Sequence, residues 1–110
     1  MKRRFTIEDA LTLKSITGRM PIHLSKDGGW LAYTVESSHK RQKGGRGFLP
    51  SGAPVCMEGC EVWVTEVESG ESQNLTPDWG TSWSPRWSPD GSQLAFYSDR
   101  NGTAQLWVWE

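Results

Sequence analysis

Two cysteines and two histidines are the residues of this sequence best suited to hold a metal ion. Cys56 and Cys60 stand four residues apart, and His23 and His39 are the only histidines. A structural zinc site takes four such ligands, so all four side chains would have to meet. His23 fits better on the first strand of a repeat, and two cysteines are too few for a disulfide scaffold. We therefore expect free thiols or an adventitious bridge, and no metal-binding residues.

A second stretch whose residues could bind a ligand is basic and rich in glycine. It contains Lys40, Arg41, Lys43 and Arg46, interleaved with glycines. A phosphate-binding loop needs glycines that open a helix after a strand, whereas here Pro50 comes next and no helical pattern does. The stretch predicts a solvated, mobile loop, with contact to an anion or an RNA as the alternative.

No set of side chains indicates catalysis. The two histidines lie in unlike contexts, so any serine–histidine–aspartate triad would be an arbitrary choice. No Gly-x-Ser-x-Gly nucleophile elbow occurs. Asp99 and Arg100 could be functional, but such a pair more often caps a turn and ties neighbouring sheets together. We expect no catalytic residues, no cofactor-binding residues and no cofactor.

Seven tryptophans in 110 residues are the most unusual number in the composition. They could form a stacking platform for a sugar, a peptide or a base. Trp63 and Trp107, however, occupy equivalent positions of a repeat within the sequence, which favours packing between sheets. Trp79, Trp83 and Trp87 lie around the start of one predicted strand, and an intervening proline excludes a helical stripe there.

Charge and hydropathy exclude several classes of protein. The net charge of −1 gives no electrostatic case for binding a nucleic acid or an anionic membrane. The mean hydropathy of −0.59 and the lack of a long apolar run argue against a transmembrane helix. Met1–Arg4 is basic like the start of a signal peptide, but Glu8, Asp9 and Lys14 interrupt the next residues, so an apolar region is lacking. We therefore expect a cytoplasmic protein.

Two segments of the chain occur twice. Leu24–Tyr33 and Trp87–Phe96 align at an offset of 63 residues, and each combines an Asp-Gly turn with a Leu-Ala-aromatic strand. Glu61–Val64 and Gln105–Val108 align at an offset of 44 residues. The two offsets differ because the first copy carries an insertion, which falls within residues 39–59. The sequence is therefore a repeat protein.

Each copy of the repeat indicates short strands joined by hairpins. We predict strands at Trp30–Val35, Gln73–Leu75, Leu94–Tyr97 and Ala104–Trp109. The strands are apolar on both faces, so each sheet needs cover on both sides. Near the N-terminus, Thr6–Asp9 resembles a capping box and predicts a helix of about two turns that ends before residue 18.

Short strands with two apolar faces are typical of β-propeller blades, which are four-stranded antiparallel sheets. Ser88–Gly91 and Leu94–Gly102 resemble the repeat of TolB-like propellers and of the N-terminal propeller in the prolyl oligopeptidase family. Phe5–Leu11 is similar to the opening of acylaminoacyl-peptidase-like members of that family. The resemblance covers residues 5–110. Lys26 departs from it, since the family usually has proline there, and so does the basic insertion.

The resemblance implies an all-β fold, a partial β-propeller with about two four-stranded antiparallel blades and a short N-terminal helix. We expect residues 1–18 to form the helix and lead-in, residues 19–76 blade one, and residues 77–110 a second blade that lacks its outer strand. In this family the propeller restricts substrate access to a serine hydrolase domain. The chain is therefore interpreted as a non-catalytic propeller fragment; the alternative is a TolB-like protein-binding module.

Two blades cover only one face of each other. The two outer faces and the edge of the strand Ala104–Trp109 would then be bare, which favours association. We expect self-association through an open blade face or through this edge. A peptide or protein is a further candidate partner, whereas no nucleic acid or membrane is expected.

Overall fold

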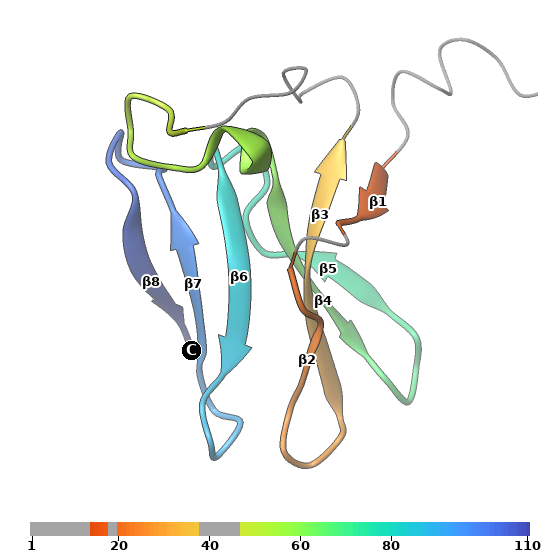
Figure 1. The fold of residues 1–110 in the computed structure, drawn as a ribbon. Coiled ribbons are helices and arrows are strands. Elements are labelled where there is room, and N and C mark those ends of the chain that lie inside the picture. The colour runs from red at the N-terminus through yellow and green to blue at the C-terminus, as the bar shows by residue number, and fades with distance from the viewer. Residues whose placement is uncertain (1–13, 18–19, 38–46) are drawn as a thin grey trace, which may run out of the picture.

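The structure is a computed structural model that describes residues 14–17, 20–37 and 47–110. These residues form two antiparallel β-sheets and one short 3-10 turn, η1 (Val55–Met57) (Figure 1). The prediction of an all-β fold is confirmed. In the described part of the chain, no helix is long and apolar enough to cross a membrane.

The first sheet is built around its longest strand, β3 (Trp30–Ser37). One edge of β3 pairs with β4 (Glu61–Glu66), and β4 pairs with β5 (Ser72–Asn74). The other edge pairs with β1 (Lys14–Ile16) and β2 (His23–Leu24) at opposite ends of β3. β1 and β2 therefore share the place of one interrupted strand, and the sheet has the four strand positions of a propeller blade.

β1 differs from the sequence-based expectation, which placed Lys14–Ile16 in a lead-in. β3 runs beyond the predicted end at Val35 to Ser37, and its last residues pair with β1. An extended edge needs partners for its backbone groups, and β1 supplies them. The helix predicted from the capping box Thr6–Asp9 lies outside the described residues.

The second sheet contains three strands in sequence order: β6 (Ser82–Trp87), β7 (Leu94–Ser98) and β8 (Gln105–Trp109). The outer strand β8 pairs with β7 and with no other described strand. The sheet therefore has one strand position fewer than the first, as expected for the second blade. Together the sheets form a partial β-propeller of two neighbouring blades (Figure 1).

The strand register reproduces the repeat found in the sequence. Tyr33 lies opposite Trp63 in the first sheet, and their counterparts Phe96 and Trp107 lie opposite each other in the second. Both sheets thus pair the same repeat positions, although the insertion separates these positions by different lengths of chain. The two offsets of 63 and 44 residues therefore describe one structural unit that occurs twice.

The turns that begin each repeat have the same hydrogen bonds. In the first, the Ser25 hydroxyl donates to Asp27 Oδ1 at 2.7 Å, and the backbone N–H of Gly29 donates to the same atom at 2.9 Å. In the second, Ser88 and the backbone N–H of Ser92 donate to Asp90 Oδ1 at 2.7 and 3.0 Å. The glycine after each aspartate has a φ of 75°, which a residue with a Cβ adopts only with strain.

The main core lies between the two sheets. Ala32, Val62, Val64 and Leu75 from the first sheet meet Leu94 and Phe96 from the second, and all six are buried. Trp79, Trp87 and Trp107 pack against this cluster. The predicted packing role between sheets therefore holds for these three tryptophans.

The second half of the insertion differs from the solvated loop that the sequence predicted. Ala53 and Met57 are fully buried and form a second cluster with Cys60 and Trp83. The carbonyl of Ser51 accepts a hydrogen bond from the backbone N–H of Ala104 at 2.8 Å. Burial of these apolar side chains against Trp83 is the physical reason that this part of the insertion packs on the fold, although Phe48 remains 74% exposed. Residues 39–46 lie outside the described part of the chain.

We predict an acid-sensitive turn at Asp90. Hydrogen bonds from the Ser88 hydroxyl and from the N–H and hydroxyl of Ser92 lower the pKa of Asp90 from 3.8 to about 2. A carboxyl with a lower pKa in the folded state contributes stability above its unfolded pKa, and this contribution is lost as the pH falls through the folded pKa. NMR titration of the carboxyl carbon should therefore give a midpoint near 2.

The substitution Asp90→Asn should remove part of the loss of stability between about pH 4 and pH 2 in urea unfolding, since no carboxyl remains to be protonated. Glu68→Gln is the matched control, because Glu68 is an exposed carboxyl outside the two repeat turns. An unchanged pH dependence in Asp90→Asn would contradict this role of the turn.

Candidate functional site

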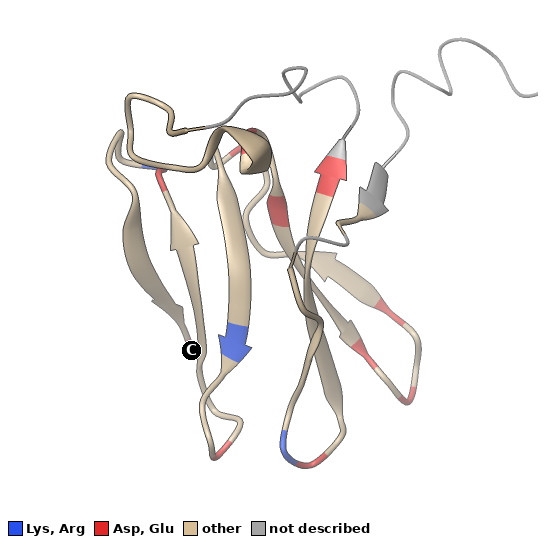
Figure 2. Cartoon of the chain, in the orientation of Figure 1, with Lys and Arg blue, Asp and Glu red and all other residues tan. Residues whose placement is uncertain are grey.

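Two open clefts lie at opposite ends of the boundary between the sheets. The first, here called the acidic cleft, lies where β6 begins and β7 ends. The second, the basic cleft, lies where β2 and β6 end, and Figure 2 shows positive charge on the end of β6 and in the turn after β2. The charges of the two clefts therefore suit different ligands.

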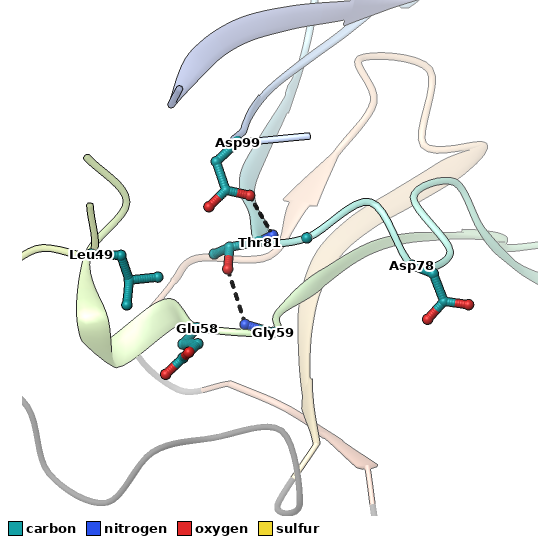
Figure 3. A pocket seen from close by; sticks show the side chains of 7 residues that line it. Leu49, Glu58, Gly59, Asp78, Thr81 and Asp99 are labelled. Carbon is teal, nitrogen blue, oxygen red and sulfur yellow. Dashed lines mark hydrogen bonds between the residues drawn. The ribbon is translucent and has the colours of Figure 1, made fainter. Parts of the chain in front are cut away.

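The acidic cleft has a volume of about 430 Å³ and is formed by segments far apart in the sequence. The insertion, the linker from β5 to β6 and the turn after β7 each contribute a carboxylate to its lining. Its residues are Leu49, Glu58, Gly59, Asp78, Gly80, Thr81 and Asp99 (Figure 3). No lysine or arginine is among them.

Asp99 holds the floor of the acidic cleft together. Its Oδ1 accepts a hydrogen bond from the backbone N–H of Thr81 at 2.7 Å, and its Oδ2 accepts one from the Ser51 hydroxyl at 2.7 Å. The Thr81 hydroxyl oxygen accepts from the backbone N–H of Gly59 at 3.0 Å (Figure 3). Both carboxylate oxygens of Asp99 thus join separate segments of the chain, as expected of a structural residue.

The other carboxylates of the acidic cleft do not converge with Asp99. Figure 3 shows Asp78 pointing away from Asp99 and Glu58 on a different wall. One carboxylate oxygen of Glu58 is buried without a hydrogen bond among the described residues. In that part of the chain, no group of three histidine, cysteine or acidic side chains is placed to hold a metal ion.

Arg100 turns away from its neighbour Asp99 and contacts aromatic rings. Its guanidinium carbon lies 3.7 Å from the ring centroid of Trp79 and 5.2 Å from that of Trp107. A guanidinium over an aromatic face is a favourable cation–π contact. Asp99 and Arg100 therefore each join parts of the fold, which is the structural role predicted for the pair.

The basic cleft has a volume of about 450 Å³ and walls from both sheets. It combines a histidine, a lysine and an arginine with apolar side chains, and none of its residues is acidic. The lining consists of His23, Leu24, Lys26, Arg86, Trp87, Ser88 and Pro89. His23 lies on β2, the first strand of the repeat beside the turn, as predicted.

The boundary between the sheets is closed by hydrogen bonds that the sequence did not predict. The backbone N–H groups on the free edge of β6 donate to acceptors in or beside the first sheet. These bonds run from Ser82 to the Cys60 carbonyl at 2.9 Å, from Ser84 to the Thr34 hydroxyl at 3.1 Å, and from Trp87 to His23 Nδ1 at 2.7 Å. A threonine in a strand and a lone histidine give no local signal of such a contact.

The remaining predicted site residues belong to the packing of the molecule. Cys56 and Cys60 are free cysteines, and both contribute to the second cluster. Trp83 lies in the same cluster and stacks on Tyr97, with 5.4 Å between ring centroids. His39 and the basic stretch at residues 40–46 lie outside the described residues.

Gly80 is predicted to be essential for the floor of the acidic cleft. A Cβ at this position would lie 2.5 Å from Asp99 Oδ1, and its φ is 81°. Gly80→Ala should therefore displace Asp99 from Thr81 as well as strain the backbone. Gly102→Ala is the matched control, because Gly102 has a similar φ of 87° but open space around it.

Urea unfolding should show a loss of about 1 kcal/mol in Gly102→Ala, from the backbone alone. The loss in Gly80→Ala should exceed it by at least about 1 kcal/mol, because a buried hydrogen bond is disturbed. Equal losses of unfolding free energy in the two variants would show that displacing Asp99 does not destabilise the fold.

Comparison with known proteins connects the chain to a peptidase. No family model matches it. It is 33% identical over 109 residues to the uncharacterised peptidase YuxL of Bacillus subtilis (strain 168). The match covers 98% of this chain, but the chain spans only 14% of the length of that relative. A solved structure, a putative TolB from Agrobacterium tumefaciens, is similar with a TM-score of 0.43 and 22% identity, over 77% of this chain and 40% of that one.

Proposed function

We propose that this chain supplies two neighbouring blades of a propeller that restricts the access of substrates in a peptidase-type protein. On this proposal its own residues perform no catalysis. The observation that supports it is the match of 98% of the chain to a small part of a protein named as a peptidase. A segment of that kind contributes architecture, and the reaction takes place elsewhere.

The repeat supports the assignment to a larger propeller. Equivalent positions form a face that is buried in the first sheet and exposed in the second. On β3 and β4, one face of the first sheet packs under the second sheet and is buried. The same positions in the second sheet are largely exposed. Ala32, Thr34, Val62 and Val64 are 0, 1, 0 and 4% exposed, whereas Tyr97, Leu106 and Val108, the counterparts of the last three, are 45, 63 and 55% exposed.

This exposed face of the second sheet, with Ala95, Tyr97, Leu106 and Val108, is here called the open face. Its side chains are apolar although they face solvent, and apolar surface in such a patch marks an interaction site. Since the first repeat uses this face to receive the second sheet, the open face suits another blade. That blade comes from the same polypeptide or from a second copy of the chain.

We predict that the 110-residue chain does not hydrolyse acyl-amino-acid anilides or esters above the rate in buffer. The reason is that the sequence contains no Gly-x-Ser-x-Gly nucleophile elbow, and that Nδ1 of His23 is occupied by the backbone N–H of Trp87. A serine-directed phosphonate should leave the intact protein unlabelled by mass spectrometry. Stoichiometric labelling at one site would overturn the non-catalytic role.

We also predict that the isolated chain self-associates through the open face. Leu106→Glu places a charge in the middle of this face and should weaken association at least about tenfold, since burying an unpaired charge is costly. Val67→Glu is the matched control, because Val67 is 48% exposed in a turn outside the open face. Sedimentation equilibrium at tens of micromolar measures the effect. A folded wild-type monomer at that concentration would contradict the prediction.

A further inference from the structure

The two cations of the basic cleft come from different sheets and are not neutralised. Lys26 belongs to the turn after β2, and Arg86 belongs to β6. Neither has an ion partner among the described residues. The carboxylates of the adjoining turns, Asp27 and Asp90, accept hydrogen bonds within their own turns. Two positive charges across a cleft without a carboxylate attract an anion.

His23, a further polar residue of the cleft, can offer a hydrogen-bond donor as well. His23 Nδ1 accepts the backbone N–H of Trp87 at 2.7 Å, so the proton of the neutral imidazole lies on Nε2. Trp87 also lines the cleft. Its side chain packs against the main core, and the indole N–H is buried without an acceptor in the described part of the chain.

The apolar part of the cleft restricts the kind of anion. Leu24 is 50% exposed, and Trp87 and Pro89 also belong to the lining. An inorganic anion would leave these surfaces uncovered, whereas an anion that carries an apolar group would bury them. The lining thus favours a carboxylate with a hydrophobic side chain next to it.

We propose that the basic cleft binds the C-terminal carboxylate of a peptide whose last residue is apolar. The carboxylate lies between Lys26 and Arg86, and the side chain of the last residue packs on Leu24 and Trp87. The inference deepens the proposed function, on which it rests: a propeller that controls access to a peptidase would hold peptides by one end. Because the walls belong to both sheets, the ligand would bridge the two blades.

Titration of ¹⁵N-labelled protein with N-acetyl-leucine, followed by NMR, tests the proposal. N-acetyl-leucinamide is the neutral control with the same side chain, and inorganic phosphate is the anion without one. The resonances of the Trp87 indole, the Trp87 backbone and His23 should shift with the acid. The amide and phosphate should each bind at least about tenfold more weakly, since each lacks one of the two contacts.

Variants of the two cations separate binding from folding. Lys26→Pro removes one charge and places at this position the residue that the equivalent turn already has, Pro89, so the turn is expected to remain intact. Arg86→Gln removes the other charge, and Arg86→Lys keeps it. Each loss of charge should weaken binding about fivefold, and Arg86→Lys should stay within about twofold of the wild type.

Equal affinity for the acid and the amide would overturn the carboxylate site, and equal affinity for the acid and phosphate would overturn the apolar contact. An effect of Arg86→Lys as large as that of Arg86→Gln would also overturn the charge-based site. Self-association and the absence of phosphonate labelling are measured without this ligand. They therefore distinguish a failed cleft proposal from a failed propeller proposal.

Discussion

The free edge of β6 is the constraint on which the arrangement of the two sheets depends. A strand at the edge of a sheet leaves alternate backbone N–H groups without partners, and burying them unpaired costs free energy. Here β6 is pressed against the first sheet, where the Cys60 carbonyl, the Thr34 hydroxyl and the His23 ring accept its N–H groups. The two sheets can therefore approach closely enough to bury Phe96 and Leu94 between them.

A β-bulge adjusts β6 to these acceptors. The register of β6 with β7 shifts by one residue between Trp83 and Arg86, and Ser84 has a φ of 56°. In an unbroken strand, the alternation from Ser82 and Ser84 would turn the N–H of Arg86 toward the first sheet. The extra residue moves this role to Trp87, which meets His23. Pro85, within the bulge, has no N–H that would need a partner.

The features that the sequence predicted are local or periodic. The Asp-Gly turns and the strands β3, β7 and β8 follow from residue types and from the repeat. β1 was missed because its partner, the end of β3, is the only feature that fixes it. The cluster around Met57 was missed because the insertion has no periodicity, and its cover comes from Trp83 and Ala104.

Neither cleft could be predicted, because the residues of each come together only through contacts between distant parts of the chain. Glu58, Asp78 and Asp99 line one cleft only because the insertion folds over the start of β6. Lys26 and Arg86 face one cleft because the two repeats lie side by side. The repeat marked Trp107 as equivalent to Trp63 and so favoured packing, and Trp107 does pack against the main core. The sequence offered no such marker for side chains whose partners lie on the other blade.

The second residue of each repeat turn has a consequence for how such proteins diversify. The turns at Ser25–Gly29 and Ser88–Ser92 share their hydrogen bonds, although one contains Lys26 and the other Pro89. All of these bonds come from the serine, the aspartate and the backbone. The side chain of the second residue, Lys26 or Pro89, is therefore not needed to form the turn. Since this position occurs in both blades at the same end of the sheet, substitutions there could change the charge at that end while leaving the fold of the two blades intact.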